Sequence, residues 1–483
     1  MNITFDADKN KAVLKCSDSN LFEYIRHHFS IENKAKKFIK NKLKARHMPS
    51  RLYAITPTGL FEPGMADEIR SFAAAEQLAS EVMTTPLFDN LYGGKIQTSV
   101  FEHLNLTLRD YQSSAVQHCI NNGRGICVLG TGAGKTLITA SLACSLLHCK
   151  NSVLILVPDP GLADQTYNDF LSYGVTSRMC LWTGTTPDLD ASAQIIIANH
   201  DIVLSRFENY EWLKDVDALI VDEVHTIKKN NSITKIIDKI QTKNKFGFTG
   251  TLPVDELDLW CVLGKIGKVL MTKSSAELRL QQVLTNAKVS AIHITYKNNP
   301  QYIVRKEDSD ENMSENYRKE LEFIYNNEYR NRVITQICKN YDNNILILIN
   351  HLQHGECLYN ALQQCINKQI IYINGETSLE QRNAGKQLLE TCNNVVCIAM
   401  SSIFSTGINI KNLHMIIFAA GGKSFIRVVQ SIGRGLRKAQ NKQLLTIIDI
   451  VDNLRYGIRH HQQRIKIYES EKFSCTQTKL VEN

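Results

Sequence analysis

Short apolar runs alternate with helical patterns along most of the chain. Between residues 104 and 270 these runs hold four to six residues each, and they are ICVLG, SVLILV, QIIIAN, DALIVD and KFGFTG. After residue 316 a second series follows, which consists of NILILINH, QIIYING, VVCIAMSS, MIIFAAGG and LLTIIDIV. Continuous runs of Val, Ile and Leu between helices indicate parallel strands that are buried on both faces. The pattern therefore predicts two α/β domains in tandem, each built on a parallel sheet.

The remaining regions have a different pattern. Residues 1–100 alternate strand-like stretches, such as AVLKC and RLYAI, with helical ones, such as LFEYIRHHF, and predict a small α/β accessory domain. Residues 271–316 have no regular period and end in the acidic, polar KEDSDENMSEN, so we expect an irregular connection there. The predicted order is 1–100 accessory domain, 101–275 first α/β domain, 276–316 connection, 317–465 second α/β domain and 466–483 C-terminal tail.

A glycine-rich segment after the first run, GTGAGKT at 130–136, predicts a phosphate-binding loop. Its glycines let backbone N–H groups surround a β-phosphate, Lys135 neutralises the β- and γ-phosphate oxygens, and the Thr136 hydroxyl suits Mg²⁺. The common pattern has a glycine where Leu129 stands, and we interpret Leu129 as the last buried residue of the preceding strand. The predicted ATP-binding residues of this loop are Gly130, Thr131, Gly132, Ala133, Gly134, Lys135 and Thr136.

Further polar side chains follow other predicted strands of the first α/β domain. DALIVDEVH places Asp222 and Glu223 at the carboxyl edge of the sheet, where ligands bind in open α/β folds. We expect Asp222 to hold Mg²⁺ and Glu223 to activate the attacking water, which favours hydrolysis of ATP over transfer to a substrate. Upstream, Arg109 and Gln112 of LRDYQ are expected to contact the adenine base. Three residues are predicted to link the hydrolytic carboxylates to the second α/β domain, and they are His225, Thr249 and Thr251.

The second α/β domain supplies a pair of cations. QSIGRGLR at 430–437 places Arg434 and Arg437 three residues apart and therefore on one helical face. Two guanidinium groups presented together can reach the γ-phosphate of ATP bound to the first domain, as arginine fingers do. A kinase or a GTPase needs no second lobe of this kind.

Taken in order, GTGAGKT, DEVH, TGT, TGIN and QSIGRGLR resemble motifs I, II, III, V and VI of the superfamily 2 helicases. LRDYQ resembles the Q-like motif of the XPB and RecG-type branch, and the whole chain resembles the phage UvsW-type recombination helicases. The resemblance implies two tandem RecA-like domains, ATP and Mg²⁺ as cofactors, and nucleotide contacts from Gly407, Asn409 and Gln430. Asn409 stands where the family often has an acidic residue for the ribose, so we expect looser nucleotide discrimination.

Several segments resemble the motifs that line the nucleic-acid groove of this family, and they would contact backbone phosphates rather than bases. The segment 34–46, KAKKFIKNKLKAR, carries seven basic residues and no acidic one. In this context a DNA contact is favoured over a solvated helix face. Lys228 and Lys229 are either duplex contacts or surface charges. The predicted nucleic-acid contacts are Lys37, Lys40, Pro158, Gln165, Thr183, Asn199, Lys228, His351, Asn374 and Ser401.

Composition narrows the class of protein. The net charge is +8, and a hydrophobic content of 43% is sufficient for ordinary cores. No apolar run approaches the ~20 residues that span a bilayer, and the N-terminus lacks the apolar core of a signal peptide. Thirteen cysteines without a C-x-x-C pair argue for reduced thiols. We therefore expect no membrane association and a cytoplasmic location, in the host cell if a phage encodes the chain.

These features predict an ATP-dependent DNA helicase that acts as a monomer on branched DNA. The family resemblance implies Holliday-junction branch migration, fork regression, and unwinding of D-loops and R-loops, with DNA or RNA–DNA hybrids as partners. One alternative is a double-strand DNA translocase without strand separation, although no P-D…(D/E)-x-K nuclease core is evident. Another is an ATP-gated nucleic-acid sensor, against which Lys135, Glu223 and the paired arginines argue.

Overall fold

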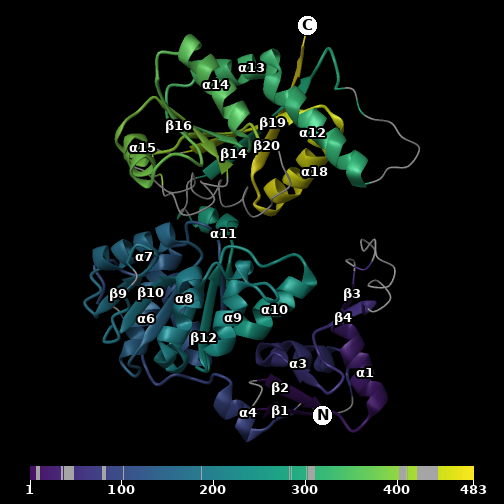
Figure 1. Cartoon of the computed structure of the whole chain (residues 1–483), viewed down its shortest axis with the longest axis vertical. Helices are drawn as coiled ribbons and strands as arrows, with labels where there is room; N and C mark the ends of the chain where they lie inside the picture. The colour runs from purple at the N-terminus through teal and green to yellow at the C-terminus, as the bar shows by residue number, and fades with distance from the viewer. Residues whose placement is uncertain are drawn as a thin grey trace. The chain divides into compact units, whose positions relative to one another are not determined.

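The computed structural model describes residues 1–6, 11–33, 36, 48–78, 83–101, 103–186, 188–281, 283, 286–300, 302, 310–401, 410, 412–420 and 444–482. The chain forms two compact units, of which the first comprises residues 1–129 and 134–273 and the second residues 130–133 and 274–483. Each unit is built around one large sheet (Figure 1). Within these described ranges, no helix is long and apolar enough to cross a membrane.

The large sheet of the first unit confirms the parallel strands predicted from the apolar runs. Across the sheet, its strands among the described residues are β13 (Val269–Lys273), β7 (Gly125–Leu129), β12 (Asn244–Thr249), β11 (Ala218–Asp222), β8 (Val153–Val157), β10 (Ile195–Asn199) and β9 (Met179–Trp182). All of the pairings are parallel. In the middle, Ile155 lies opposite Ile197 and Ile220, and all three side chains are fully buried. The central strands are therefore covered on both faces, as their continuous apolar sequences require.

Helices cover both faces of this sheet. In Figure 1, α6 and α7 lie on one side of it, and α9 and α10 lie on the other. From β7 to β9 the chain adds strands toward one edge of the sheet, and after β9 it adds them in the opposite direction. Since crossover connections between parallel strands are right-handed, this reversal places the helices before and after β9 on opposite faces. The helices are α5 (Asp110–Asn122), α6 (Lys135–Leu147), α7 (Pro160–Ser172), α8 (His200–Arg206), α9 (Ser232–Lys239) and α10 (Glu256–Ile266), with 3-10 turns η3 (Phe207–Asn209), η4 (Glu211–Asp215) and η5 (Val224–Thr226).

The N-terminal region forms the small α/β fold that its mixed pattern predicts. Its sheet has the order β5 (Leu60–Phe61), β2 (Lys11–Lys15), β1 (Asn2–Asp6) and β6 (Met83–Thr84), in which β1 pairs antiparallel with β2 and parallel with β6. A separate antiparallel pair consists of β3 (Ser30–Glu32) and β4 (Arg51–Tyr53). The helices are α1 (Ser19–His28), the 3-10 turn η2 (Pro63–Met65), α3 (Ala66–Ala75) and α4 (Pro86–Leu91).

This accessory fold packs against α10 of the first α/β domain through a charged contact. Glu62 forms ion pairs with Lys11 of its own sheet and, at 2.7 Å, with Lys265 of α10, and Lys265 also pairs with Asp238 of α9. Burial raises the pKa of the Glu62 carboxyl, but Lys265 and Lys11 outweigh this effect, so its pKa falls below the ordinary value. Next to it, a side chain on Gly64 would collide with the Leu263 carbonyl oxygen, so the backbones meet without a side chain between them.

The second unit contains a second parallel sheet, as predicted. Across the sheet, its strands among the described residues are β16 (Gln369–Ile373), β17 (Val395–Met400), β15 (Ile345–Ile349), β18 (Met415–Phe418), β19 (Leu444–Asp452), β14 (Asn286–Thr295) and β20 (Ser474–Val481). The helices are α11 (Ser275–Leu280), α12 (Asp310–Asn326), α13 (Glu328–Lys339), α14 (Leu352–Cys365), α15 (Leu379–Thr391) and α18 (Arg455–Ser470). The two sheets confirm an α/β protein with two parallel-sheet domains in tandem.

Two regions are more regular than the sequence pattern predicts. The expected irregular stretch 271–316 contains α11 and the ten-residue strand β14, and the expected tail contains the edge strand β20. The prediction of irregular structure was wrong for β14 because its buried residues alternate with exposed and half-buried ones, without a continuous apolar run. The sequence analysis assigned no strand to the tail. Among the described residues β20 is mostly exposed and pairs with β14, so burial leaves almost no trace in its sequence.

We expect Glu62→Gln to lower the free energy of unfolding by about 2–3 kcal/mol, because it leaves the buried Lys265 with less compensating charge. Glu62 stabilises the fold above its unfolded-state pKa, since its folded pKa is lowered, and this contribution disappears as the pH falls through the folded value. Thermal melts of both proteins at pH 7 and near pH 3 measure the difference. Glu390→Gln, at an exposed position of α15, is the matched control and should melt like the wild type. Equal melting of Glu62→Gln and wild type at pH 7 would contradict the prediction.

Candidate ATP-binding and hydrolysis site

The glycine-rich loop joins the end of β7 to the start of α6. Leu129 is the last residue of β7 and is fully buried, which confirms its interpretation as a strand residue. Gly132 and Gly134 have positive φ angles of 85° and 76°, a backbone conformation that glycine adopts without strain. Lys135 and Thr136 begin α6, so the unpaired N–H groups and the positive end of the helix dipole lie at the loop. This geometry suits a phosphate group.

Two carboxylates lie at the end of β11, close to this loop. Lys135 Nζ is 3.4 Å from Glu223 Oε1, and Asp222 Oδ1 accepts a hydrogen bond of 2.9 Å from the Glu223 backbone N–H. Burial and the neighbouring Glu223 charge raise the pKa of Asp222. Burial opposes ionisation of Glu223 as well, but Lys135 and His225 outweigh it and lower the pKa of Glu223. Glu223 therefore ionises at a lower pH than Asp222.

A chain of contacts leads from Glu223 to the end of the neighbouring strand β12. His225 Nδ1 lies 3.2 Å from Glu223 Oε2 and 2.8 Å from the hydroxyl of Thr249. That hydroxyl donates to the carbonyl oxygen of Thr251 at 2.8 Å, so it accepts the hydrogen of His225 Nδ1. The three residues predicted to couple hydrolysis to the second domain thus lie together with Glu223.

The site has donors that fit ATP and Mg²⁺. Glu223 Oε2 is buried, and apart from its 3.2 Å contact with His225 Nδ1 it has no hydrogen-bond partner among the described residues, so it can accept a hydrogen bond from a water molecule. The Asp222 carboxylate and the Thr136 hydroxyl are oxygen ligands of the kind that Mg²⁺ prefers. Glu223 also has a positive φ of 49°, which is uncommon for a residue other than glycine and turns the chain sharply after β11.

The predicted adenine-binding residues lie beside the loop. Arg109 and Gln112 form the N-terminal capping box of α5, in which Gln112 Oε1 accepts from the Arg109 N–H at 2.9 Å. Gln112 is almost completely buried, and its amide nitrogen would lie 2.6 Å from a Cβ atom on Gly134. Gln112 is predicted to contact adenine, and in the structure its side-chain oxygen caps α5. The Gln112 side chain therefore lies next to Gly134 of the loop and leaves no room for a Cβ atom there.

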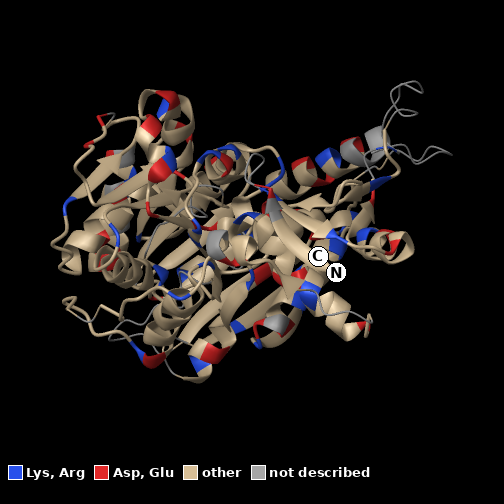
Figure 2. Ribbon diagram, turned by 90° about the horizontal axis from the view of Figure 1, so that it is seen from below, with Lys and Arg blue, Asp and Glu red and all other residues tan. Residues whose placement is uncertain are grey.

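The predicted nucleic-acid contacts of the first unit lie mainly at the other half of the same sheet edge. Pro158 follows β8, Asn199 ends β10 and Thr183 follows β9, and these three strands are neighbours. Asn199 is almost fully buried, and its side-chain oxygen has no hydrogen-bond partner among the described residues. Gln165 lies on α7, and Lys228 pairs with Asp258 of α10 at 3.4 Å. In Figure 2, Lys and Arg residues are interspersed with Asp and Glu along the described ribbon.

In the second unit, His351, Asn374 and Ser401 follow β15, β16 and β17, which are also neighbouring strands. Ser401 donates a hydrogen bond to Asn350, and Asn374 Oδ1 accepts from the Thr377 N–H at 3.1 Å, which closes a turn. These residues therefore share one sheet edge. The other predicted residues lie outside the described residues, and they are Lys37, Lys40, Gly407, Asn409, Gln430, Arg434 and Arg437, together with most of the basic segment 34–46.

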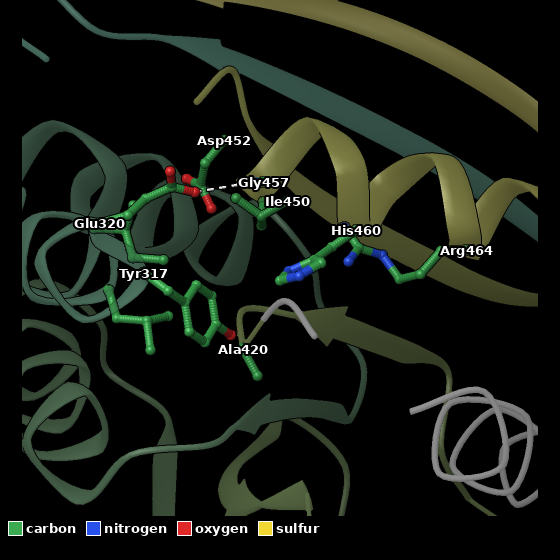
Figure 3. Close-up of a pocket in the computed structure, with 10 residues that line it drawn as sticks. Tyr317, Glu320, Ala420, Ile450, Asp452, Gly457, His460 and Arg464 are labelled. Carbon is green, nitrogen blue, oxygen red and sulfur yellow. Dashed lines mark hydrogen bonds between the residues drawn. The ribbon is translucent and has the colours of Figure 1, made fainter. Parts of the chain in front are cut away.

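A buried network at the ends of β18 and β19 was missed by the sequence predictions. Arg330 is fully buried, pairs with Asp452 at 2.7 Å and donates to the Ala419 carbonyl oxygen at 2.7 Å. Glu320 accepts from the Gly457 N–H at 2.8 Å and so caps α18. Figure 3 shows the adjoining cavity, whose volume of about 20 Å³ suits one water molecule rather than a ligand. No sequence signal marks Arg330, because it stands among other polar residues on α13.

Family models match both α/β domains. The model of the type III restriction enzyme res subunit matches residues 105–254, and that of the helicase conserved C-terminal domain matches residues 328–439. The chain belongs to the superfamily 2 helicases. This helicase is 28% identical over 390 residues to the ATP-dependent DNA helicase uvsW of Enterobacteria phage T4. The matched residues make up 75% of each of the two chains.

Other relatives of the helicase are more distant. It is 22% identical to the DNA 3'-5' translocase XPB2 of Sulfurisphaera tokodaii over 81% of this chain and 93% of that protein. The solved structure of the ATP-dependent Type ISP restriction-modification enzyme LlaBIII bound to DNA has a TM-score of 0.56 and 15% identity. This likeness covers 77% of the helicase and 31% of that enzyme, and it concerns the fold alone. The family and the fold predicted from the sequence are confirmed, and the helicase is an ATP-dependent hydrolase.

Gly134→Ala is expected to weaken ATP binding at least tenfold. The positive φ of 76° strains any other residue by about 1–2 kcal/mol, and the new Cβ would displace Gln112 from the loop. Titration with a fluorescent ATP analogue without DNA measures the effect. Gly184→Ala is the control, since a Cβ atom there meets nothing within 4 Å. Wild-type affinity in Gly134→Ala would show that the loop does not hold the phosphates in this conformation.

Thr249→Val should lower DNA-stimulated ATP turnover by about tenfold and leave ATP affinity within twofold. The substitution removes the acceptor for His225 Nδ1 and the donor to Thr251, and an unsatisfied buried group costs about 1–3 kcal/mol. Steady-state kinetics with and without DNA separate the two quantities. Thr249→Ser keeps the hydroxyl and should restore turnover. Equal turnover in the valine and serine variants would rule out a role for the hydroxyl.

Proposed function

We propose that the helicase is a Mg²⁺-dependent DNA motor that remodels branched DNA, including Holliday junctions, stalled forks, D-loops and R-loops. The similarity to the phage T4 helicase over 75% of both chains is the observation that carries this proposal. We further propose residues 101–275 and 317–465 as the two motor domains, the second with its sheet completed by β14 and β20, and residues 1–100 as a DNA-binding domain. We also propose that it acts as a monomer, and that it works in the cytoplasm of a host cell, a location that the phage relative supports.

The proposed division of labour at the ATP site follows its geometry. Lys135 binds the β- and γ-phosphate oxygens of the substrate, and the loop N–H groups and Gly132 and Gly134 shape the cradle. Asp222 and Thr136 would hold Mg²⁺, which screens the charge of the phosphates when bound. Glu223, kept ionised by Lys135 and His225, accepts a proton from the attacking water through Oε2. Arg434 and Arg437 are proposed to stabilise the charge that develops on the γ-phosphate.

Glu223→Gln tests this assignment. The amide keeps the shape of the side chain but accepts no proton, so we expect ATP affinity within a few-fold of wild type. ATP hydrolysis should fall by about 10²-fold or more, because general-base catalysis contributes about that much. Rates of phosphate release and the affinity for a fluorescent ATP analogue are measured on the same samples. Wild-type hydrolysis by Glu223→Gln would refute the role of Glu223.

The substrate is tested with a labelled four-way junction and a tailed duplex, each with ATP and with a non-hydrolysable analogue. ATP-dependent dissociation of the junction supports branch migration. The second candidate is a double-strand DNA translocase without strand separation, which the match to the restriction-enzyme family model and the XPB2 relative favour. Such a motor would displace a triplex-forming strand from a duplex and leave the tailed duplex intact. DNA-stimulated turnover of ATP would exclude a sensor that binds ATP without cycling.

A further inference from the structure

The first unit contains a cavity of about 480 Å³ between the accessory fold and helices α9 and α10. This volume lies in the range of pockets that bind small molecules. Its walls come from β2, β4, β5 and η2 on one side and from α9, α10 and the loop after η5 on the other. The hydrolytic residues described above are not among those that line it. The cavity is therefore a second candidate site.

The lining combines aromatic rings with lysines. Tyr53 and Trp260 are half-buried and line the cavity, and Trp260 is held by an edge contact with Phe29 at a ring distance of 6.0 Å. Lys229 and Lys235 line it as exposed residues, and no carboxylate of the described residues pairs with either of them. Flat rings beside unpaired ammonium groups suit a ligand with a planar face and a negative charge.

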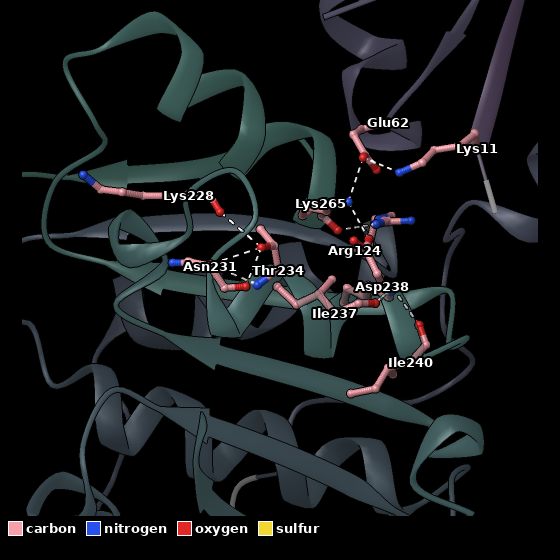
Figure 4. Close-up of polar contacts among 11 residues, drawn as sticks. Lys11, Glu62, Arg124, Lys228, Asn231, Thr234, Ile237, Asp238, Ile240 and Lys265 are labelled. Atoms are coloured by element: carbon pink, nitrogen blue, oxygen red, sulfur yellow. Dashed lines mark hydrogen bonds and ion pairs between the residues drawn. The ribbon is translucent and has the colours of Figure 1, made fainter. Parts of the chain in front are cut away.

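The cavity also contains two carboxylates, which restrict where a negative group can bind. Glu62 and Asp238 both line it, and both pair with Lys265, as Figure 4 shows. A phosphate placed near them would be repelled, so it belongs on the side of Lys229 and Lys235. A carboxylate is instead a suitable acceptor for the exocyclic amino group of a nucleobase. The interior thus suits a base, and the Lys229 and Lys235 side suits a phosphate.

We propose that this cavity binds one unpaired nucleotide of a branched DNA, with the base beside Trp260 and Tyr53 and the adjacent phosphate on Lys229 and Lys235. This inference rests on the proposed function, because it concerns how the branch of that substrate is held. An unpaired base next to a branch enters such a pocket at a smaller free-energy cost than a base in an intact duplex. The proposal gives the accessory fold a specific task, which is to select branched over continuous DNA.

The cavity is connected to the hydrolytic site by hydrogen bonds from side chains to backbone carbonyl oxygens of the loop after Glu223. Thr226 Oγ1 donates to the Glu223 carbonyl oxygen at 2.8 Å, and Asn231 Nδ2 donates to the Thr226 carbonyl oxygen at 2.7 Å. Thr234, which lines the cavity, donates to the Lys228 carbonyl oxygen at 3.1 Å. The loop that carries Lys229 is thus joined by hydrogen bonds to the residue proposed as general base. A nucleotide on Lys229 therefore contacts a loop whose position affects Glu223.

Trp260→Leu tests the proposal, with Trp260→Phe as the rescue and Trp212→Leu, a half-buried tryptophan outside the cavity, as the matched control. The probes are a forked duplex with 2-aminopurine as the first unpaired base and a continuous duplex of the same length, both without ATP. We expect Trp260→Leu to lose about tenfold in affinity for the fork and less than twofold for the duplex. The 2-aminopurine signal of the wild type should disappear in Trp260→Leu and return in Trp260→Phe.

Two results would overturn the nucleotide pocket. One is an equal loss of affinity for fork and duplex in Trp260→Leu, and the other is unchanged fork binding in a variant that melts like the wild type. Unchanged binding would leave an acidic, aromatic peptide of a partner protein as the occupant. Failure of the proposed function is distinguishable, since it appears as a lack of ATP-dependent junction dissociation in the wild type while the fork-selective base signal remains.

Combined replacement of Lys229 and Lys235 by Gln tests the phosphate side. The slope of log K against log salt concentration should become shallower by about 1–2 for the fork, because released counterions scale with neutralised phosphates. Lys239→Gln is the control, since that lysine already pairs with Glu208. An unchanged slope for the fork would remove Lys229 and Lys235 from the site.

Discussion

Parallel pairing of strands buried on both faces is the constraint on which the rest of this molecule depends. Parallel strands need crossover connections, so every strand of a sheet ends at the same edge, and the loops that follow gather there. In the first unit that edge brings three residues into one site although they are far apart in sequence. Lys135 lies at the start of α6, after β7, and Asp222 and Thr249 end β11 and β12. The neighbouring half of the edge, after β8, β10 and β9, carries the residues proposed for nucleic acid.

Two buried cations of the described structure, one in each unit, are compensated by carboxylates, and each also joins elements. In the first unit, Lys265 pairs with Glu62 of the accessory fold and with Asp238 of α9. In the second, Arg330 joins α13 to the ends of β18 and β19 through Asp452 and the Ala419 carbonyl oxygen. A third buried cation, Lys245, has no carboxylate partner among the described residues. Its ammonium group donates to carbonyl oxygens at the end of α9, and burial lowers its pKa to about 7. These contacts fix where helices end relative to the sheets.

The loop after Glu223 contributes residues to both the hydrolytic site and the cavity. Its start contributes the proposed general base and the His225 contact to Thr249, and its later residues line the cavity beside the accessory fold. Hydrogen bonds of Thr226 and Asn231 make the segment a single ordered turn. A motor that hydrolyses ATP in response to DNA structure requires a physical connection of this kind, since coupling between two sites needs an element that both of them contact.

The sequence by itself determined the two parallel sheets and the residues at their edges, because continuous apolar runs and glycine-rich turns have few other solutions in water. It predicted Leu129 as a strand residue and the grouping of Asp222 and Glu223 with Lys135. It did not predict β14 or β20, whose burial is partial. Only the tertiary structure decided that Glu62 meets Lys265, that Arg330 meets Asp452, and that Trp260 and Tyr53 face one cavity. These pairings join residues more than 100 positions apart, and local patterns carry no record of which distant side chain satisfies a buried charge.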